Sequence, residues 1–255
     1  MLLTPPFEDE TFLEVEERSL PTRAGSCPMP LLYRDSSLLA LAFPTDPRRA
    51  AALFDGASIE PWVFARHALT IIAALQHRDT SIGPHAEIAV LVPCRLRGSA
   101  PSLLRFALDM RAQEDQGTWP ATIAVDTDAA VRASEPWGYA RYRTDIDVRF
   151  EPERTRIETR ELVIDVAAPR GPSLHTLPLI TYSERAGRLL RTISETEGAA
   201  RLGTGLGARV ELHADGPTAA LLRALGLERA RPSAVARVDR LRARVPPGAD
   251  LGPNR

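Results

Sequence analysis

Two charged residues, Glu87 and Arg141, have the types and settings that chemistry on a small organic molecule would require. Glu87 lies within the apolar run 85–93, where an acid is rarely tolerated unless it is paired or functional, and there it could act as a general acid or base. Arg141 carries a planar guanidinium, which suits carboxylate and enolate oxygens. Each residue also has a simpler interpretation as half of a structural ion pair, and the two could neutralise one another.

Two stretches of the chain supply four further candidates for contact with a bound molecule: His85, Trp137, Tyr139 and Glu135. A histidine titrates near neutral pH and could line a cavity, although a structural histidine is the simpler interpretation. The two aromatic rings more often serve packing than chemistry. Glu135 could orient its segment, but an ion pair with Arg132 or Arg141 is favoured.

The chain contains no lysine, and all 32 of its basic residues are arginines. Covalent catalysis through an imine needs an uncharged amine, whereas arginine stays protonated at any pH at which a protein folds. The one primary amine is the α-amino group of Met1. Schiff-base chemistry on a side chain is therefore excluded.

Motifs for metals and cofactors are not evident. His67, His77 and His85 are spaced 10 and 8 residues apart, which fits neither an HExxH nor a CxxC pattern, so no metal site is predicted. The glycine cluster 203–207 does not join a strand to a helix in the way that nucleotide-binding loops do. We therefore predict no cofactor.

Composition limits the partners and the compartment. A net charge of −1 and a pI near 6.5 give no electrostatic reason to expect binding to nucleic acid or to an anionic membrane. No apolar run approaches the roughly 20 residues of a membrane-spanning helix, and the N-terminus lacks the features of a signal peptide.

Cys27 and Cys94 are too few for a disulfide framework, so they are expected to be free thiols in a reducing cytoplasm.

Most of the elements that position the candidate residues are expected to be strands. Apolar runs and alternation predict strands at 38–43, 62–78, 85–93, 103–110, 145–150, 155–160, 162–167, 177–182, 209–213 and 235–245. Capping residues predict short helices at 48–54, 126–133 and 217–225. This is a β-rich α+β pattern. We expect an irregular N-terminal arm at 1–30, a single domain at 31–245 and a frayed tail at 246–255.

Residues 135–142, Glu-Pro-Trp-Gly-Tyr-Ala-Arg-Tyr, resemble the active-site segment of the acetoacetate decarboxylase-like family. That segment commonly runs Arg-Glu-x-x-Gly-Tyr-Pro-Lys-Phe, and its lysine forms a Schiff base with the substrate carbonyl. Arg141 stands at the lysine position and Ala140 at the proline. The resemblance therefore implies a relative of a Schiff-base enzyme from which the nucleophile has been removed.

Three other segments resemble the same family in the same order. Residues 38–47 resemble a strand that ends Tyr-Arg-Thr-Asp-Pro, with Pro44 at the arginine position. Residues 83–93 resemble its Gly-Pro-Tyr-x-Glu segment, with His85 in place of the tyrosine; in the family, that glutamate faces the substrate cavity. Residues 217–232 resemble its C-terminal end. The resemblance implies a closed or nearly closed antiparallel barrel with a few short helices, an internal cavity and a homo-oligomer.

Two classes of function follow from these residues. The first is a lyase, isomerase or cyclase that acts non-covalently on an oxo-acid or polyketide-like carbonyl compound, with Arg141 stabilising a carboxylate or enolate and Glu87 as acid or base. The alternative is a non-catalytic barrel that binds a small anionic molecule through Arg141. A third option is a scaffold subunit that assembles with a lysine-bearing paralogue. In the first two classes the partner is a small carbonyl or carboxylate compound.

Overall fold

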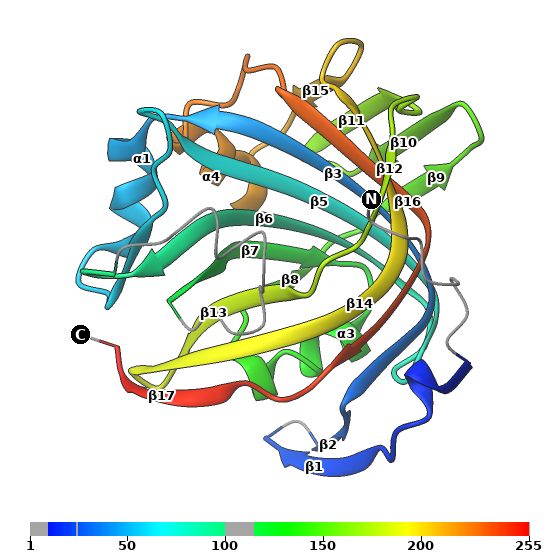
Figure 1. Cartoon of the computed structure of the whole chain (residues 1–255), viewed down its shortest axis with the longest axis vertical. Coiled ribbons are helices and arrows are strands. Elements are labelled where there is room, and N and C mark those ends of the chain that lie inside the picture. The colour runs from blue at the N-terminus through cyan, green and yellow to red at the C-terminus, as the bar shows by residue number, and fades with distance from the viewer. Residues whose placement is uncertain (1–9, 24, 100–114, 255) are drawn as a thin grey trace.

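The computed structural model describes residues 10–23, 25–99 and 115–254, and strands dominate it (Figure 1). The helical elements are η1 (Glu10–Leu13), α1 (Pro47–Ala51), η2 (Ala52–Phe54), α3 (Asp128–Arg132), η3 (Glu135–Trp137) and α4 (Pro217–Ala224). The strands in the first half are β1 (Arg18–Thr22), β2 (Gly25–Met29), β3 (Leu31–Thr45), β4 (Ile59–Pro61), β5 (Ala68–Thr80), β6 (His85–Leu96) and β7 (Gln116–Val125). Those in the second half are β8 (Arg141–Arg143), β9 (Asp147–Phe150), β10 (Arg154–Glu158), β11 (Leu162–Ala167), β12 (Ser173–His175), β13 (Leu179–Arg185), β14 (Arg188–Thr204), β15 (Arg209–Leu212), β16 (Ala234–Val245) and β17 (Ala249–Pro253).

Seven strands close into a barrel in the order β7-β6-β5-β3-β16-β14-β13 and back to β7. All of these contacts are antiparallel except the last, where Thr181 of β13 pairs in parallel with Thr118 of β7. The predicted β-rich α+β barrel is therefore confirmed, with one parallel contact that the sequence did not predict. Among the described residues, no helix is long and apolar enough to cross a membrane.

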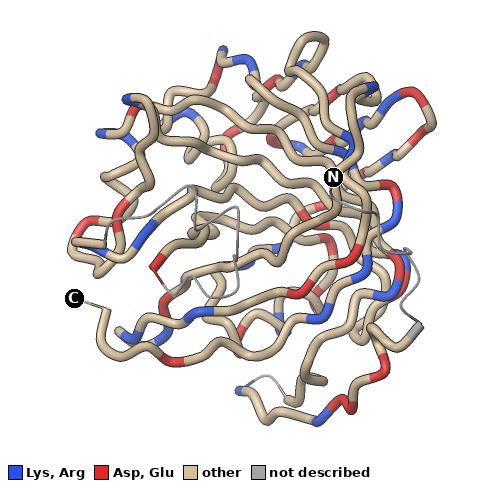
Figure 2. The backbone as a smooth tube through the Cα atoms, viewed as in Figure 1, with Lys and Arg blue, Asp and Glu red and all other residues tan. Residues whose placement is uncertain are grey.

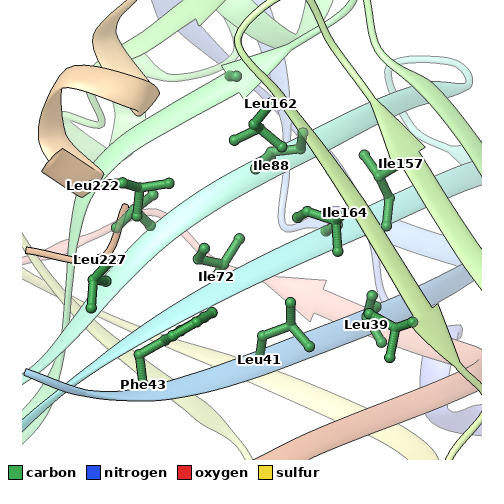
Figure 3. Packing of buried hydrophobic residues seen from close by; sticks show 14 of the residues in the cluster. Leu39, Leu41, Phe43, Ile72, Ile88, Ile157, Leu162, Ile164, Leu222 and Leu227 are labelled. Carbon is green, nitrogen blue, oxygen red and sulfur yellow. The ribbon is translucent and has the colours of Figure 1, made fainter. Parts of the chain in front are cut away.

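The outer face of the barrel carries the largest apolar core (Figure 3). Alternate residues on β3 and β5, such as Leu41 and Ile72, point outward because successive side chains of a strand face opposite ways. They pack against Ile157 and Ile164 of a separate sheet, β15-β11-β10-β9, and against Leu222 of α4. The small sheet and α4 thus brace the wall of the barrel that holds β6.

The opposite, inner face of that wall carries the candidate site. On this face the register of β5 and β6 sets Leu75 opposite Glu87 and His77 opposite His85. Directly opposed residues of an antiparallel pair share one face. The hairpin therefore places three polar side chains on an otherwise apolar inner surface.

Acidic and basic positions are interspersed along the whole trace (Figure 2). On β14 and β16 they form cross-strand pairs, with Glu195 opposite Arg244 and Glu197 opposite Arg242. The side chains of both cross-strand pairs form ion pairs. Opposite charges that face each other across neighbouring strands are stabilising. Much of the arginine content is therefore neutralised locally.

Two terminal predictions were wrong. The arm predicted to be irregular contains an antiparallel hairpin of β1 and β2, in which Leu20 pairs with Cys27. The tail predicted to be frayed contains β17, which pairs with the start of β14 from Arg188 to Arg191. At least three of the five residues in each of β1 and β17 are exposed, so neither strand carries the apolar run that would have predicted it. Cys27 and Cys94 are buried free thiols.

Strand β7 was also not predicted, although it closes the barrel. Pro120 lies within it, and a proline argues against a strand because it cannot donate to the ladder. The strand accommodates Pro120 at an irregularity where the register against β6 shifts, between the pairs Val90–Thr122 and Leu91–Pro120. The strand predicted at 103–110 lies outside the described residues.

Glu161 joins the small sheet to helix α4. Its side chain is buried and accepts hydrogen bonds from the Ala219 backbone N–H at 3.0 Å and from the Tyr142 hydroxyl at 2.8 Å. A carboxylate is favoured at a helix N-terminus, where the backbone N–H groups lack partners. A Cβ on Gly216 would lie 2.2 Å from the Glu161 carboxyl carbon, so the chain needs glycine there. Burial raises the pKa of Tyr142 to about 12, which keeps this donor protonated.

Replacing Glu161 with alanine is expected to lower the free energy of unfolding by about 2 kcal/mol, because two hydrogen bonds to a buried carboxylate are lost. Urea denaturation measures the change. Glu158→Ala is the matched control, since Glu158 is exposed and forms an ion pair with the exposed Arg156, and it should cost less than about 0.5 kcal/mol. Equal losses in the two variants would contradict this role for Glu161.

Candidate functional site

Gly138, in a left-handed backbone conformation, turns the 135–142 segment towards the inside of the barrel. Helix η3 ends at Gly138, whose φ is 67°, and a Cβ there would lie 2.5 Å from the Glu184 carbonyl oxygen. The chain then enters β8, where Arg141 pairs in parallel with Ile123 of β7. Because Gly138 fits this turn without strain, Tyr139 and Arg141 can follow it directly onto the inner face.

Arg141 and Glu87 form a buried ion pair. Arg141 Nη2 lies 3.1 Å from Glu87 Oε2, and the two side chains are 4% and 12% exposed. Glu87 Oε2 nevertheless accepts no well-aligned hydrogen bond from the described residues. Its contact with Arg141 is therefore electrostatic. Arg141 also donates to the Ala130 carbonyl at 3.0 Å and hydrogen-bonds Tyr33. The mutual neutralisation considered from the sequence is thus what the structure contains.

Two aromatic rings cover the guanidinium. Its central carbon lies 5.7 Å from the centre of the Trp137 ring and 5.8 Å from that of Tyr139, within the range of cation–π attraction. The rings stack on each other at 5.6 Å. The Trp137 indole donates to the Pro246 carbonyl at 2.6 Å, and the Tyr139 hydroxyl contacts that of Thr181 at 2.6 Å. Both aromatic candidates are therefore fixed beside Arg141.

His85 lies on the same inner face, together with His77. Their rings are 4.5 Å apart. His77 Nδ1 lies 2.8 Å from the Ser36 hydroxyl, and His85 Nδ1 lies 3.0 Å from the Gly83 carbonyl. Burial lowers the pKa of His77 well below its usual range and also lowers the pKa of His85. Both imidazoles are therefore neutral at neutral pH.

Tyr33 completes the cluster from β3. Its ring lies 4.5 Å from that of His77, and its hydroxyl hydrogen-bonds Arg141. Burial raises the pKa of Tyr33, although the nearby Arg141 charge opposes this rise. The phenol therefore stays protonated and can donate a hydrogen bond to a bound anion.

One predicted site residue is not in the cluster. Glu135 was expected to pair with Arg132 or Arg141, but its carboxylate accepts the backbone N–H of Arg23 at 2.7 Å. The acid thus ties the β1–β2 hairpin to η3. Its contribution to the site is indirect, because this contact helps to cover the end of the barrel beside Trp137.

Sequence reasoning missed two members, Tyr33 and His77. The hairpin register carried a signal for His77: a turn at Gly83 sets positions 77 and 85 opposite each other. For Tyr33 the alternation of β3 could indicate the face but not the neighbour, since it approaches Arg141 only once the barrel closes.

Several apolar side chains on the inner face of β5 are partly exposed. Leu69 at one end of β5 is 38% exposed, and Ile71 and Leu75, on the same inner face, are half-buried. Leu75 lies directly opposite Glu87.

A surface cleft of about 910 Å³ lies elsewhere, lined by residues that include Arg48, Glu60, Trp62, Phe64, Arg95 and Arg97. None of the candidate site residues lines it. Along β6, the eight residue-to-residue steps from Glu87 to Arg95 span about 26 Å at the usual strand rise. The cleft is therefore distinct from the buried cluster.

Comparison with known proteins finds no matching family model and no matching curated sequence, but several solved structures share the fold. Acetoacetate decarboxylase from Legionella pneumophila superimposes with a TM-score of 0.64 at 14% identity over 88% of both chains. An acetoacetate decarboxylase-like enzyme from Sphingomonas wittichii RW1 gives 0.59 at 13% identity over 88% of this chain and 93% of that one. The enduracididine biosynthesis enzyme MppR, complexed with the condensation product of pyruvate and imidazole 4-carboxaldehyde, gives 0.59 at 13% over 89% and 90%. The chain thus has the acetoacetate decarboxylase fold that its motifs predicted.

Breaking the ion pair from either side should be costly. Glu87→Gln or Arg141→Met is expected to lower the free energy of unfolding by about 3–5 kcal/mol, because each leaves an uncompensated buried charge. The double variant should cost less than the sum of the two. Urea denaturation of the four proteins measures the coupling.

The control for this cycle is Arg143→Met. Arg143 pairs with Asp128 at 3.1 Å, but their side chains are 56% and 63% exposed, so its loss should cost less than about 1 kcal/mol. Additive losses at Glu87 and Arg141 would show that the two charges do not depend on each other.

Proposed function

We propose that this protein is an enzyme that acts without covalent catalysis on a small oxo acid or related anionic carbonyl compound. The observation that carries the proposal is the state of Arg141. Its guanidinium is buried, its Nε has no partner, and it meets Glu87 by charge alone. An incoming carboxylate or enolate could supply the aligned acceptors that Arg141 lacks.

Decarboxylation of a β-keto acid illustrates the chemistry. The bond between the carboxylate carbon and the α-carbon breaks, CO₂ leaves, and the bonding electrons move onto the ketone oxygen as an enolate. Arg141 and the protonated Tyr33 hydroxyl would stabilise that oxygen; one such fixed donor contributes roughly 3 kcal/mol. Glu87, displaced from the guanidinium, would take a proton from water and deliver it to the α-carbon, which returns Glu87 to its carboxylate form. Isomerisation or dehydration would use the same groups.

A non-catalytic binding barrel is the second candidate, and the ion pair itself favours it. Glu87 already neutralises Arg141 at 3.1 Å, so the acid need have no role beyond that charge. A ligand carboxylate would then exchange with Glu87, and nothing would react. The fold is compatible with either function, since function depends on the site.

A turnover screen separates the two candidates. Purified protein is assayed with β-keto acids, 2-oxo acids and conjugated enones, by CO₂ release and by absorbance. An enzyme should show turnover that falls about a hundredfold to a thousandfold in Arg141→Met and is also lost in Glu87→Gln, while Arg143→Met stays active. Anionic ligands that stabilise the wild type thermally without turnover, and fail to stabilise Arg141→Met, would support the binding barrel instead.

Stability does not confound this screen. If Arg141→Met unfolds, the double variant Glu87→Gln/Arg141→Met replaces it, since it leaves neither charge unpaired. Turnover that persists in the folded double variant would contradict the proposed roles of both residues.

Borohydride trapping checks the non-covalent character of the site. Reduction in the presence of any keto acid should leave no adduct on the chain except at the Met1 amine, because the sequence contains no lysine. Intact mass and peptide mapping locate any adduct. A reduced adduct on a side chain would refute the non-covalent mechanism.

A further inference from the structure

Three side chains of metal-ligand type converge on the inner face of β5 and β6. His77, His85 and Glu87 each offer one ligand atom, and these atoms all lie within 4.8 Å of one another. The residues are only 5%, 5% and 9% exposed. The pairing register of β5 and β6 produces this cluster. It places His77 directly opposite His85, and Glu87 lies two positions further along the same face of β6.

The histidines are held in the way that metal-binding histidines commonly are. Each uses Nδ1 for a contact with the protein: His77 with the Ser36 hydroxyl and His85 with the Gly83 carbonyl. A second contact of this kind fixes the ring and directs the other nitrogen to the metal. For both residues, that other nitrogen is Nε2.

Unpartnered polar atoms gather at the same place. Among the described residues, His85 Nε2, Glu87 Oε2 and Arg141 Nε are buried and have no hydrogen-bond partner, although Glu87 Oε2 keeps its charge contact with Arg141 Nη2 at 3.1 Å. Buried polar atoms nearly always have partners in native proteins, so such a group calls for an ion, a water or a ligand. These three atoms indicate that the cluster is completed by a group that the described residues do not provide.

We propose that His77, His85 and Glu87 bind a divalent first-row transition metal ion such as Zn²⁺ or Fe²⁺. Two imidazoles and one carboxylate with open positions are a known set for both ions. Ca²⁺ and Mg²⁺ prefer oxygen ligands alone and should not compete. Ligand atoms about 2.1 Å from a shared tetrahedral ion lie roughly 3.4 Å apart, so modest side-chain rotation closes the site.

Charge balance predicts what else the metal would bind. Glu87 has two carboxylate oxygens, so one can face the ion while the other keeps Arg141. A divalent ion beside Arg141 and a single carboxylate leaves excess positive charge in a buried space, which favours an anionic ligand at an open metal position. The metal site does not require the proposed enzymatic function, because the three ligands and their contacts stand without any substrate.

Metal titration without substrate tests the site. Full-length protein stripped with chelator is titrated with Co²⁺, followed by visible absorption, and with Zn²⁺, followed by calorimetry and thermal unfolding. We expect one ion per chain, a higher Tm with Zn²⁺, and no response to Mg²⁺. His77→Gln and His85→Gln should weaken binding by about 100-fold or more. His67→Gln is the matched control, since His67 is exposed, and it should bind as the wild type does.

Two outcomes would overturn the proposal: a wild type that binds neither ion, or His77→Gln and His85→Gln variants that bind as the wild type does. If a variant does not fold, X-ray absorption of the Zn²⁺-loaded wild type decides instead. Two imidazole ligands and oxygen support the site, and sulfur ligation or oxygen alone refutes it. Because no substrate is present, failure here leaves the turnover screen unaffected, and an inactive protein can still bind the metal.

Discussion

The permanent positive charge of Arg141 determines how one end of this barrel is built. Arginine stays protonated in any folded protein, and Arg141 is 4% exposed, so its surroundings must compensate for lost hydration. Glu87 supplies the opposite charge, Ala130 and Tyr33 supply hydrogen bonds, and two aromatic faces cover the rest. These partners come from β3, β6, α3 and the η3–β8 segment, so satisfying one guanidinium requires the whole end of the barrel to assemble correctly.

The same requirement links the edge elements to the site. The β1–β2 hairpin and the segment after β16 would have little reason to order on their own. Cys27 and Met29 of β2 pack with Trp137, and the Pro246 carbonyl accepts the indole N–H. Because Trp137 also covers Arg141, these peripheral contacts exclude water from the charge that they surround. Exclusion of water strengthens every electrostatic interaction inside the cluster.

The sequence predicted more of the fold than of the site. Within the described residues, local patterns located nine of the 17 strands and the helices α1, α3 and α4, since apolar alternation and capping are encoded within a few residues. Strand β7 was missed because Pro120 argued against it, and only tertiary pairing shows where that proline is tolerated. Glu87 and Arg141 could be selected by type and motif. The juxtaposition of His77 with His85 depends on the register of β5 and β6, which linear spacing does not show.

The single parallel contact between β7 and β13 makes the barrel seam sensitive to what occupies the interior. Thr181 forms that contact with Thr118 and also meets the Tyr139 hydroxyl, which lies beside Arg141. Thr181 therefore contributes both to the β7–β13 contact that closes the barrel and to the position of Tyr139 beside Arg141. A molecule that immobilises Tyr139 would hold the seam shut, so amide protons of β7 and β13 should exchange more slowly in the occupied barrel than in the empty one.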